Sequence, residues 1–200
     1  INGVARNIYN TNELLGVVNG IYGVKTGFTN GANRCLVTGC KRGEMDIICV
    51  VLGCDTKKFR GQDSIKLIDY CFDAFEYFDI ENFINTKIIN WKNTNSDYFN
   101  IYKGLNNNLD ITYSKIDSSI IPIEKSKLNS LDIKFDINKN LSAPISNNDI
   151  IGNYEIYSGE DLIYNGNIIS NGNIYKKNIN HYFSNFFKNY SYLLNKVSIF

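Results

Sequence analysis

The stretch that decides the fold runs from residue 20 to residue 53 and reads GIYGVKTGFTNGANRCLVTGCKRGEMDIICVVLG. It contains two apolar, β-branched runs, residues 35–41 and 45–53, which are separated by three residues that include Gly43. Two such runs joined by a short connection predict a β-hairpin. Residues 20–28 are expected to form a third strand beside it. Because both hairpin strands are apolar nearly throughout, we expect both faces of this sheet to be covered.

The segment after the hairpin has the periodicity of a helix. Between Asp63 and Phe78, apolar residues recur at steps of three and four, and the positions are Ile65, Ile68, Cys71, Phe72, Phe75 and Phe78. This spacing predicts an amphipathic helix with one core-facing stripe. A sheet with a helix packed on it is one compact pair of layers, so we expect residues 1–78 to form one unit.

From residue 79 onward, short apolar runs alternate with turn formers. The runs are Lys87–Trp91, Tyr98–Tyr102, Asp110–Tyr113, Leu131–Ile137, Ile150–Tyr157 and Leu162–Ile169. Many short strands with turn signals between them predict a small all-β domain, a sandwich or barrel, over residues 79–177. The fold class expected for the whole chain is therefore α+β.

The last stretch, residues 178–200, is expected to be an amphipathic helix. Its apolar stripe consists of Phe183, Phe186, Phe187, Tyr190, Leu193, Leu194 and Val197. The interruptions by Asn, Lys and Ser make it too polar to span a bilayer. The helix either packs on its own domain or lies in a membrane interface through residues 181–197 with its apolar face down. The terminal position favours the membrane surface, with modest electrostatic help from Lys188 and Lys196.

The composition excludes two kinds of partner. The 21 basic and 20 acidic residues nearly cancel, and no basic stripe is interleaved with aromatics, so we expect no nucleic-acid binding. All five cysteines precede residue 72, without a CxxC pair, and the single histidine, His181, is far from them. A metal site is therefore not expected. We expect the cysteines to be small buried side chains, with one disulfide as the alternative.

Lys25, Thr26 and Gly27 form the first stretch with a chemical signature. A phosphate-binding loop would need Gly before the Lys and a helix afterwards, whereas Val24 precedes Lys25 and a strand follows. The alternative is the Lys-Thr-Gly element of penicillin-binding proteins and serine β-lactamases, which lies on a strand at the edge of the active site. In that setting the lysine places a positive charge beside a substrate carboxylate, and the threonine offers it a hydroxyl. The glycine leaves room for the substrate backbone.

Further stretches are similar to the D-alanyl-D-alanine carboxypeptidases, the low-molecular-mass penicillin-binding proteins of peptidase family S11. Residues 20–53 followed by FRGQDSIKLIDYCF (59–72) resemble the end of their catalytic domain, and NTNELL (10–15) resembles the segment before their triplet strand. LSAPISNNDIIGNYEIY (141–157) resembles the signature of their second, β-rich domain. A terminal amphipathic helix that holds the enzyme to the membrane belongs to the same pattern. The resemblance covers essentially the whole chain.

The resemblance implies a role for each matching position. Lys25 and Thr26 would bind the terminal carboxylate of a D-Ala-D-Ala stem peptide, and Lys25 would help to relay protons. Gly27 would permit the close approach, and the backbone N–H of Phe28 would be one of two oxyanion-hole donors. Arg60 would hold a carboxylate or anchor a loop, and an exposed charge at the start of the helix is the alternative. No metal or organic cofactor is implied, and β-lactam antibiotics would inhibit the intact enzyme.

The reaction of that family also needs a nucleophilic serine in Ser-x-x-Lys and a second element, Ser-x-Asn. The sequence contains no Ser-x-x-Lys, and the triplet Ser146-Asn147-Asn148 lies in the predicted β-rich domain. Because the first residue is Ile, we expect the chain to begin after processing, after truncation or inside a larger product, with both elements upstream. The chain is then the C-terminal part of such an enzyme and is expected to be inactive alone.

The expected function is therefore that of a serine-type D-Ala-D-Ala carboxypeptidase that trims peptidoglycan stem peptides through an acyl-enzyme. It would act at the outer face of the bacterial cytoplasmic membrane. The alternative is a non-enzymatic envelope module whose β-domain and membrane-lying tail position a partner. A β-lactamase fragment fits less well, because those enzymes lack the β-domain and the anchor.

Overall fold

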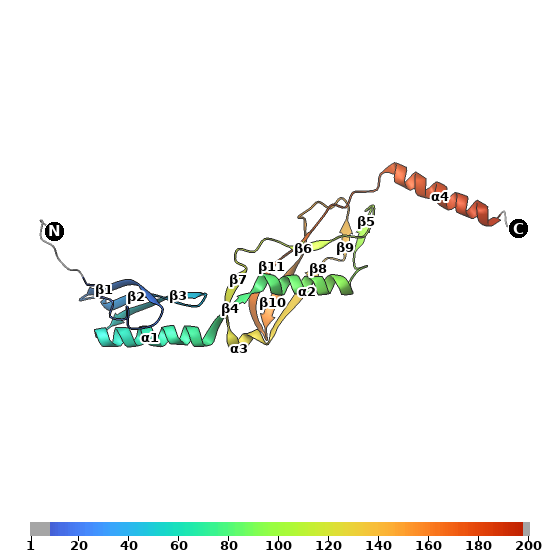
Figure 1. Cartoon of the computed structure of the whole chain (residues 1–200). Helices are drawn as coiled ribbons and strands as arrows, with labels where there is room; N and C mark the ends of the chain where they lie inside the picture. The colour runs from blue at the N-terminus through green and yellow to red at the C-terminus, as the bar shows by residue number, and fades with distance from the viewer. Residues whose placement is uncertain (1–8, 198–200) are drawn as a thin grey trace, which may run out of the picture. The chain divides into compact units, whose positions relative to one another are not determined.

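The computed structural model describes residues 9–197, and the side chains of residues 9–192. The chain divides into two compact units (Figure 1). The first unit extends to Asp79 and includes Ile120–Asn129, and the second comprises Ile80–Ser119 and the chain from Ser130 onward. Helices and antiparallel sheets occur in separate stretches of the chain, so the expected α+β class is confirmed.

The first unit is a three-stranded antiparallel sheet with a helix along one face (Figure 1). The elements are β1 (Ile21–Thr29), β2 (Asn33–Arg42), β3 (Met45–Cys54) and α1 (Lys57–Ala74). The predicted hairpin is confirmed, with Gly43 at a φ of 60° in its turn. Between sheet and helix lies a core of Leu14, Ile21, Leu36, Cys40, Cys49, Val51, Cys54 and Ile68.

Both ends of α1 differ from the prediction. The helix begins at Lys57 rather than Asp63, because Thr56 caps it and its hydroxyl accepts the N–H of Phe59 at 3.1 Å. It ends at Ala74 because the next residues form β4 (Phe75–Asp79), which pairs with β7 (Ile120–Glu124). A short helix, α3 (Lys125–Leu128), follows β7. Local periodicity could not reveal β4, since its partner lies more than forty residues further along the chain.

The second face of the β1–β3 sheet is open in the part of the chain that the structure describes. Tyr22, Ile48 and Val50 lie on it and are more than half exposed. Residues at alternate positions of the same strands, such as Leu36 and Cys49, face α1 and are buried. The expectation that both faces are covered is therefore wrong for the described residues, since α1 is the helix that packs on this sheet and it covers one face.

The second unit contains a four-stranded antiparallel sheet in the order β6-β11-β10-β8. Its strands are β6 (Ile111–Tyr113), β8 (Leu131–Ile137), β10 (Ile150–Ser158) and β11 (Asp161–Ser170), and a separate parallel pair consists of β5 (Asn100–Tyr102) and β9 (Asn140–Ser142). The predicted strand Lys87–Trp91 is wrong. These residues belong to α2 (Ile80–Thr94), whose buried Ile80, Ile84 and Ile88 follow helical spacing. The window of five residues was too short to show that period.

The sheet of the second unit is centred on Tyr154, which is fully buried on β10. Its ring lies against Gly166, the opposite residue on β11, where an added Cβ would lie 2.5 Å from the hydroxyl oxygen. Among the described residues the Tyr154 hydroxyl has no hydrogen-bond partner. Burial raises the pKa of this hydroxyl well above its ordinary value. The ring therefore fits here because residue 166 has no side chain, while its polar end is left unsatisfied.

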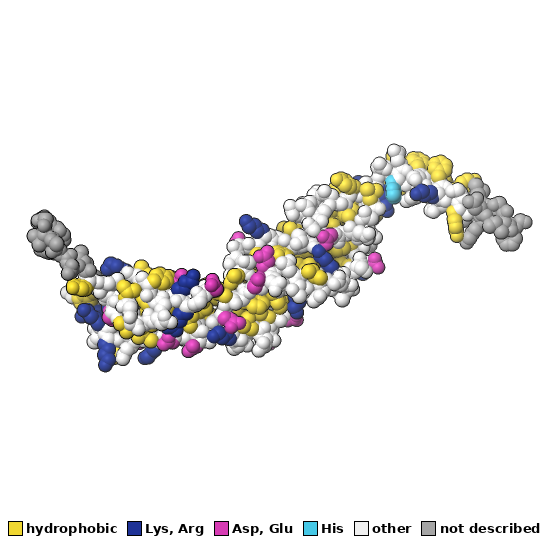
Figure 2. All heavy atoms as spheres, viewed as in Figure 1, with side chains coloured by type: hydrophobic (Ala, Val, Ile, Leu, Met, Phe, Trp, Pro, Cys, Tyr) yellow, Lys and Arg dark blue, Asp and Glu magenta, His cyan; other side chains and the backbone are white. Residues whose placement is uncertain are grey.

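The terminal helix, α4 (Ile179–Val197), is present as predicted. Its aromatic side chains are at least half exposed, among them Tyr182, Phe183 and Phe186. Figure 2 shows hydrophobic side chains gathered on α4 with few charged ones between them. The side chains of Leu193, Leu194 and Val197 lie outside the described residues. No described helix is long and apolar enough to cross a membrane.

We predict that Gly166→Ala lowers the free energy of unfolding of the second unit by about 1–3 kcal/mol, because the new methyl group would overlap the Tyr154 ring. Tyr154→Phe is expected to be neutral or to stabilise the unit by up to about 1 kcal/mol, because it removes an unsatisfied buried hydroxyl. Denaturant unfolding followed by tryptophan fluorescence measures both effects. The signal reports on the second unit alone, since the single tryptophan, Trp91, packs there against Tyr98 and Phe135.

The same pair of variants gives a pH test. Because the pKa of Tyr154 is raised in the folded state, its stability contribution is complete below the ordinary tyrosine pKa of about 10 and is lost as the pH rises above it. Tyr154→Phe should therefore lose less stability than the wild type above about pH 10. Equal losses in the two proteins would contradict the burial argument.

Candidate active site

The Lys-Thr-Gly triplet lies on β1, which is an edge strand of the described sheet. In the register of β1 with β2, Thr26 lies opposite Leu36, which is buried under α1. Lys25 lies opposite Val37, on the open face. Paired residues of neighbouring strands point to the same side, so Lys25 and Thr26 point to opposite faces of the edge strand.

The Lys25 ammonium group nevertheless reaches the edge of the strand beside Thr26. Its Nζ donates to the backbone carbonyl of Thr26 at 2.9 Å. The side chain of Lys25 is exposed, so an anion at this edge can approach it from solvent. The ammonium of Lys25 and the hydroxyl of Thr26 are thus two donors on neighbouring residues, which suits an oxygen acceptor that carries negative charge.

The segment before β1 is tied to this strand by side-chain contacts. The Oγ1 atoms of Thr11 and Thr26 are 2.6 Å apart, and Nδ2 of Asn12 donates to the carbonyl of Gly23 at 3.3 Å. Asn12 is 4% exposed, and Leu14 is buried in the core below the sheet. The sequence reasoning noted this segment for its resemblance but assigned no role to Thr11 or Asn12. Two side-chain amides and a hydroxyl in the consecutive residues 10–12, which precede the turn that leads into the strand, were the available signal.

Arg60 is buried at 3% exposure and not on the surface. Its guanidinium forms an ion pair with the Glu13 carboxylate through both Nε and Nη2, and Nη1 donates to the Cys35 carbonyl at 3.4 Å. Cys35 lies opposite Gly27 in the register. The exposed-charge alternative is therefore wrong, and these contacts favour the loop-anchor interpretation. Direct contact of Arg60 with a substrate stays a prediction.

Gly27, the last residue of the triplet, and Phe28, which follows it, differ in their contacts. A Cβ added at Gly27 would meet only the Cβ of Cys35, at an ordinary 3.6 Å, so packing within the described residues does not require glycine there. The Phe28 ring is exposed, and the guanidinium carbon of Arg34 lies over it, 4.7 Å from the centroid of the ring. The oxyanion-donor role of the Phe28 N–H stays a prediction.

The cysteines and Ser146 do not complete this site. The five cysteines are free; Cys40, Cys49 and Cys54 are buried as predicted, whereas Cys35 and Cys71 are partly exposed. Burial raises the pKa of the Cys49 thiol, which keeps it protonated and unreactive. Ser146 lies in a turn of the second unit, where its backbone N–H donates to Asp149. No described group of His, Cys, Asp or Glu side chains could hold a metal ion.

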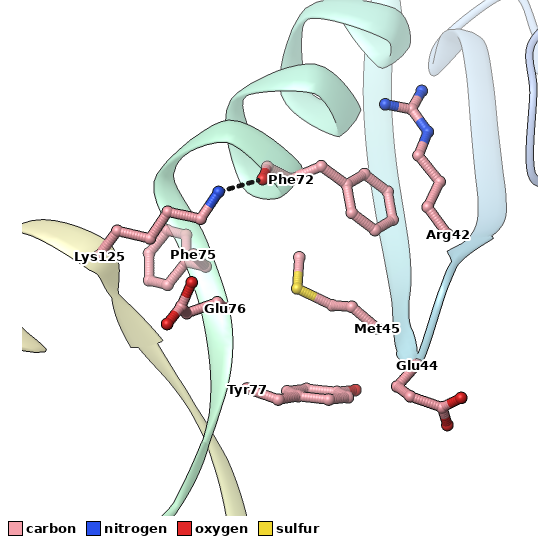
Figure 3. Close-up of a pocket in the computed structure, with 8 residues that line it drawn as sticks. All are labelled: Arg42, Glu44, Met45, Phe72, Phe75, Glu76, Tyr77 and Lys125. Carbon is pink, nitrogen blue, oxygen red and sulfur yellow. Dashed lines mark hydrogen bonds between the residues drawn. The ribbon is translucent and has the colours of Figure 1, made fainter.

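A separate hollow of about 310 Å³ lies at the opposite end of the same sheet (Figure 3). Phe72, Met45 and Tyr77 line it, and Lys125 donates to the Phe72 carbonyl at its rim. Arg42 stacks on Phe72 and forms an ion pair with Asp69 at 3.1 Å. The hollow lies beside the turn between β2 and β3, whereas the triplet lies towards the other end of β1. The hollow is therefore not part of the candidate site.

Comparisons with known proteins agree with the order of these parts. A sequence model described as D-alanyl-D-alanine carboxypeptidase, peptidase S11, matches residues 2–56, which contain the triplet strand. A second model, the C-terminal domain of penicillin-binding protein 5, matches residues 86–176. The two matches occur in the same chain in this order: the first lies within the first unit, and the second covers most of the second unit together with residues 120–129 of the first.

Individual relatives point the same way. The chain is 30% identical to D-alanyl-D-alanine carboxypeptidase DacF of Bacillus subtilis over 145 residues, which is 72% of this chain and 35% of that protein. It is 28% identical to DacD of Escherichia coli over 68% of this chain and 32% of that protein. Penicillin-binding protein 5 of Haemophilus influenzae has a similar structure, with a TM-score of 0.58 at 24% identity over 82% of this chain and 46% of that one. The chain thus spans about a third of the length of the curated relatives it matches.

A Lys-Thr-Gly edge strand backed by a helix, followed by a separate β-rich unit, defines a protein of the penicillin-binding class. The chain belongs to the family of the low-molecular-mass D-alanyl-D-alanine carboxypeptidases and corresponds to their C-terminal portion.

We predict that Glu13→Gln loosens the triplet strand, because it leaves the buried Arg60 charge without its counterion. The expected cost is about 1–3 kcal/mol in local stability. Amide hydrogen exchange measured by mass spectrometry should be faster in β1 and β2 of this variant. Glu44→Gln is the matched control, since Glu44 is exposed in the β2–β3 turn. Equal exchange in the two variants would contradict an anchoring role for the ion pair.

Proposed function

We propose that the intact protein that contains this chain is a serine-type D-Ala-D-Ala carboxypeptidase that trims peptidoglycan stem peptides. The observation that carries the proposal is the pair of donors on β1: the Lys25 ammonium lies beside Thr26, whose hydroxyl is exposed enough to meet a ligand. A D-Ala-D-Ala peptide ends in a carboxylate, the acceptor that such a pair binds best. Peptides of this kind, and penicillins that mimic them, are the proposed ligands.

In the proposed reaction, Lys25 and Thr26 hold the terminal carboxylate and Gly27 lets the peptide lie close to the strand. The nucleophilic serine lies in a part of the intact protein outside this sequence. Its hydroxyl gives up a proton, which Lys25 helps to relay to the leaving amine, and its oxygen attacks the carbonyl carbon of the penultimate D-Ala. The Phe28 N–H stabilises the resulting oxyanion. The C–N bond then breaks, and the terminal D-Ala leaves as an amine after it has gained a proton. Water hydrolyses the acyl-serine, which restores the serine and leaves a shortened peptide.

The open face of the sheet supports a catalytic domain that continues beyond this sequence. Ile48 and Val50 are more than half exposed on the face that also carries Lys25. A further part of the domain would bury them, which agrees with the length of the relatives. We therefore propose that the 200 residues alone are inactive.

We also propose that α4 holds the protein on the outer surface of the cytoplasmic membrane. Phe183, Phe186 and Tyr190 share one face of the helix, whereas His181 and Lys188 lie on the other. Exposed aromatic rings on one face of a helix favour the membrane interface. This arrangement supports a peripheral anchor.

The function is tested by treating membranes of the source cells with a tagged penicillin and identifying the labelled proteins. We expect one labelled protein to contain peptides from around Lys25 and to be much larger than this chain. In the intact protein, Lys25→Ala should slow acylation at least about a hundredfold, because the fixed charge at the carboxylate is lost. Lys41→Ala, in the adjacent strand, should have no effect.

If the product that contains Lys25 is never labelled, the catalytic proposal is wrong. The non-enzymatic envelope module would then be the better description.

The anchor is tested by flotation of the chain with phosphatidylcholine liposomes. The double change Phe183→Ser and Phe186→Ser should reduce binding at least about tenfold, because two large apolar side chains no longer leave water. Asn185→Ser on the polar face is the control. Binding should depend little on salt, since residues 178–200 contain only two lysines, Lys188 and Lys196. Flotation that survives truncation at Asn178 would rule out this anchor.

A further inference from the structure

We infer that Thr11 is a positioning residue for Thr26 and keeps the Thr26 hydroxyl ready to donate to the substrate carboxylate. The inference rests on the proposed carboxypeptidase function. The two residues are fifteen positions apart in the sequence, yet their Oγ1 atoms are 2.6 Å apart. This contact joins a residue of the preceding loop to the functional hydroxyl of the triplet.

The loop places Thr11 by contacts that do not involve its own hydroxyl. The Asn12 backbone N–H donates to Oδ1 of Asn10 at 2.9 Å, and Oδ1 of Asn12 accepts the N–H of Leu14 at 3.1 Å. The Asn12 amide donates to the Gly23 carbonyl, which lies on β1 three residues before Thr26. Asn12 and Leu14 are both buried. The loop is therefore held against β1 whether or not Thr11 carries a hydroxyl.

A second set of contacts fixes the loop at Glu13, two residues after Thr11. Glu13 binds the buried Arg60 guanidinium, which also donates to the Cys35 carbonyl. Cys35 lies opposite Gly27, the residue after Thr26. Asn12 and Glu13, the two residues that follow Thr11, are thus each tied to the β1–β2 pair. The Thr11 hydroxyl has a defined place beside Thr26.

The chemistry of two hydroxyls explains why this place matters. Each hydroxyl has one proton to donate and two lone pairs that accept. A carboxylate only accepts, so Thr26 must donate to it. When Thr11 donates to Thr26, the Thr26 proton stays free for the substrate. A chain of donors from Thr11 through Thr26 to a carboxylate is also cooperative, because each bond polarises the next.

The contact also restricts the Thr26 side chain. Threonine is branched at Cβ and has few staggered χ1 positions, and the bond to Thr11 selects one of them. Thr26 is only partly buried, so packing alone leaves its hydroxyl free to turn towards water. Thr11 removes that freedom before the substrate binds, which lowers the entropy cost of binding.

The test uses the intact protein with Thr11→Val, which keeps the shape of the side chain and removes the hydroxyl, and with Thr11→Ser, which keeps the hydroxyl. Acylation by benzylpenicillin should be roughly three- to tenfold slower in Thr11→Val and close to wild type in Thr11→Ser. The loss should appear mainly in KM for a D-Ala-D-Ala peptide, because the bond acts on carboxylate binding. The melting temperatures of both variants should match the wild type, because Thr11 is exposed.

Two further measurements separate positioning from a structural role. Benzylpenicillin methyl ester lacks the free carboxylate, so the wild type and Thr11→Val should react with it equally slowly. In a background of Thr26→Val, Thr11→Val should cost nothing more, because the two hydroxyls act as one unit. Loss with the ester, or full additivity with Thr26→Val, would show that Thr11 acts elsewhere and would overturn the inference.

The proposed function and this inference fail in distinguishable ways. If the wild type is labelled and Thr11→Val reacts just as fast, Thr11 has no positioning role and the carboxypeptidase proposal stands. If the wild type itself is not acylated, the carboxypeptidase proposal fails and the inference falls with it.

Discussion

The pairing register of β1 with β2 is the constraint on which the candidate site depends. Side chains along a strand alternate between its two faces, so a slip of one residue would exchange the faces of Lys25 and Thr26. Two contacts hold this register. The Tyr22 ring lies over Gly39, where an added Cβ would come within 2.4 Å of it, and Arg60 binds the carbonyl of Cys35. The site is therefore determined by residues on three elements, most of which have no chemical role of their own.

The sequence was sufficient for the parts of the fold whose signal is local. The hairpin of β2 and β3 and the amphipathic character of α1 and α4 follow from spacing within each segment. Pairing between distant segments was not visible. β4 and β7 are separated by more than forty residues, and the residues of β4 continue the apolar spacing of α1. The residues of β4 alone therefore do not distinguish between a helix that continues through them and a strand that begins with them.

The same distinction applies to the site. The triplet could be singled out as a candidate, and placed on a strand, because its residue types and their adjacency are themselves the signal. The buried state of Arg60 could not, because a charged residue near the start of a helix is usually exposed. Its burial requires Glu13, which lies 47 residues earlier in the chain. The contact between Thr11 and Thr26 likewise depends on a loop that folds back along β1, and loop geometry is set by individual hydrogen bonds and not by periodicity.

The open face of the sheet relates the fold to how strongly Lys25 would attract a carboxylate. Lys25 shares this face with exposed apolar side chains, so in the described chain its side chain is open to solvent. At 4 Å, two unit charges attract about four times more strongly at an effective dielectric constant of about 20 than in bulk water. Whatever covers Ile48 and Val50 would therefore also strengthen the pull of Lys25 on a carboxylate. Burial of the apolar face and activation of the charged edge are then consequences of one packing event. The triplet strand described here presents two donors in a fixed register, but it lacks the buried surroundings that the proposed function would require.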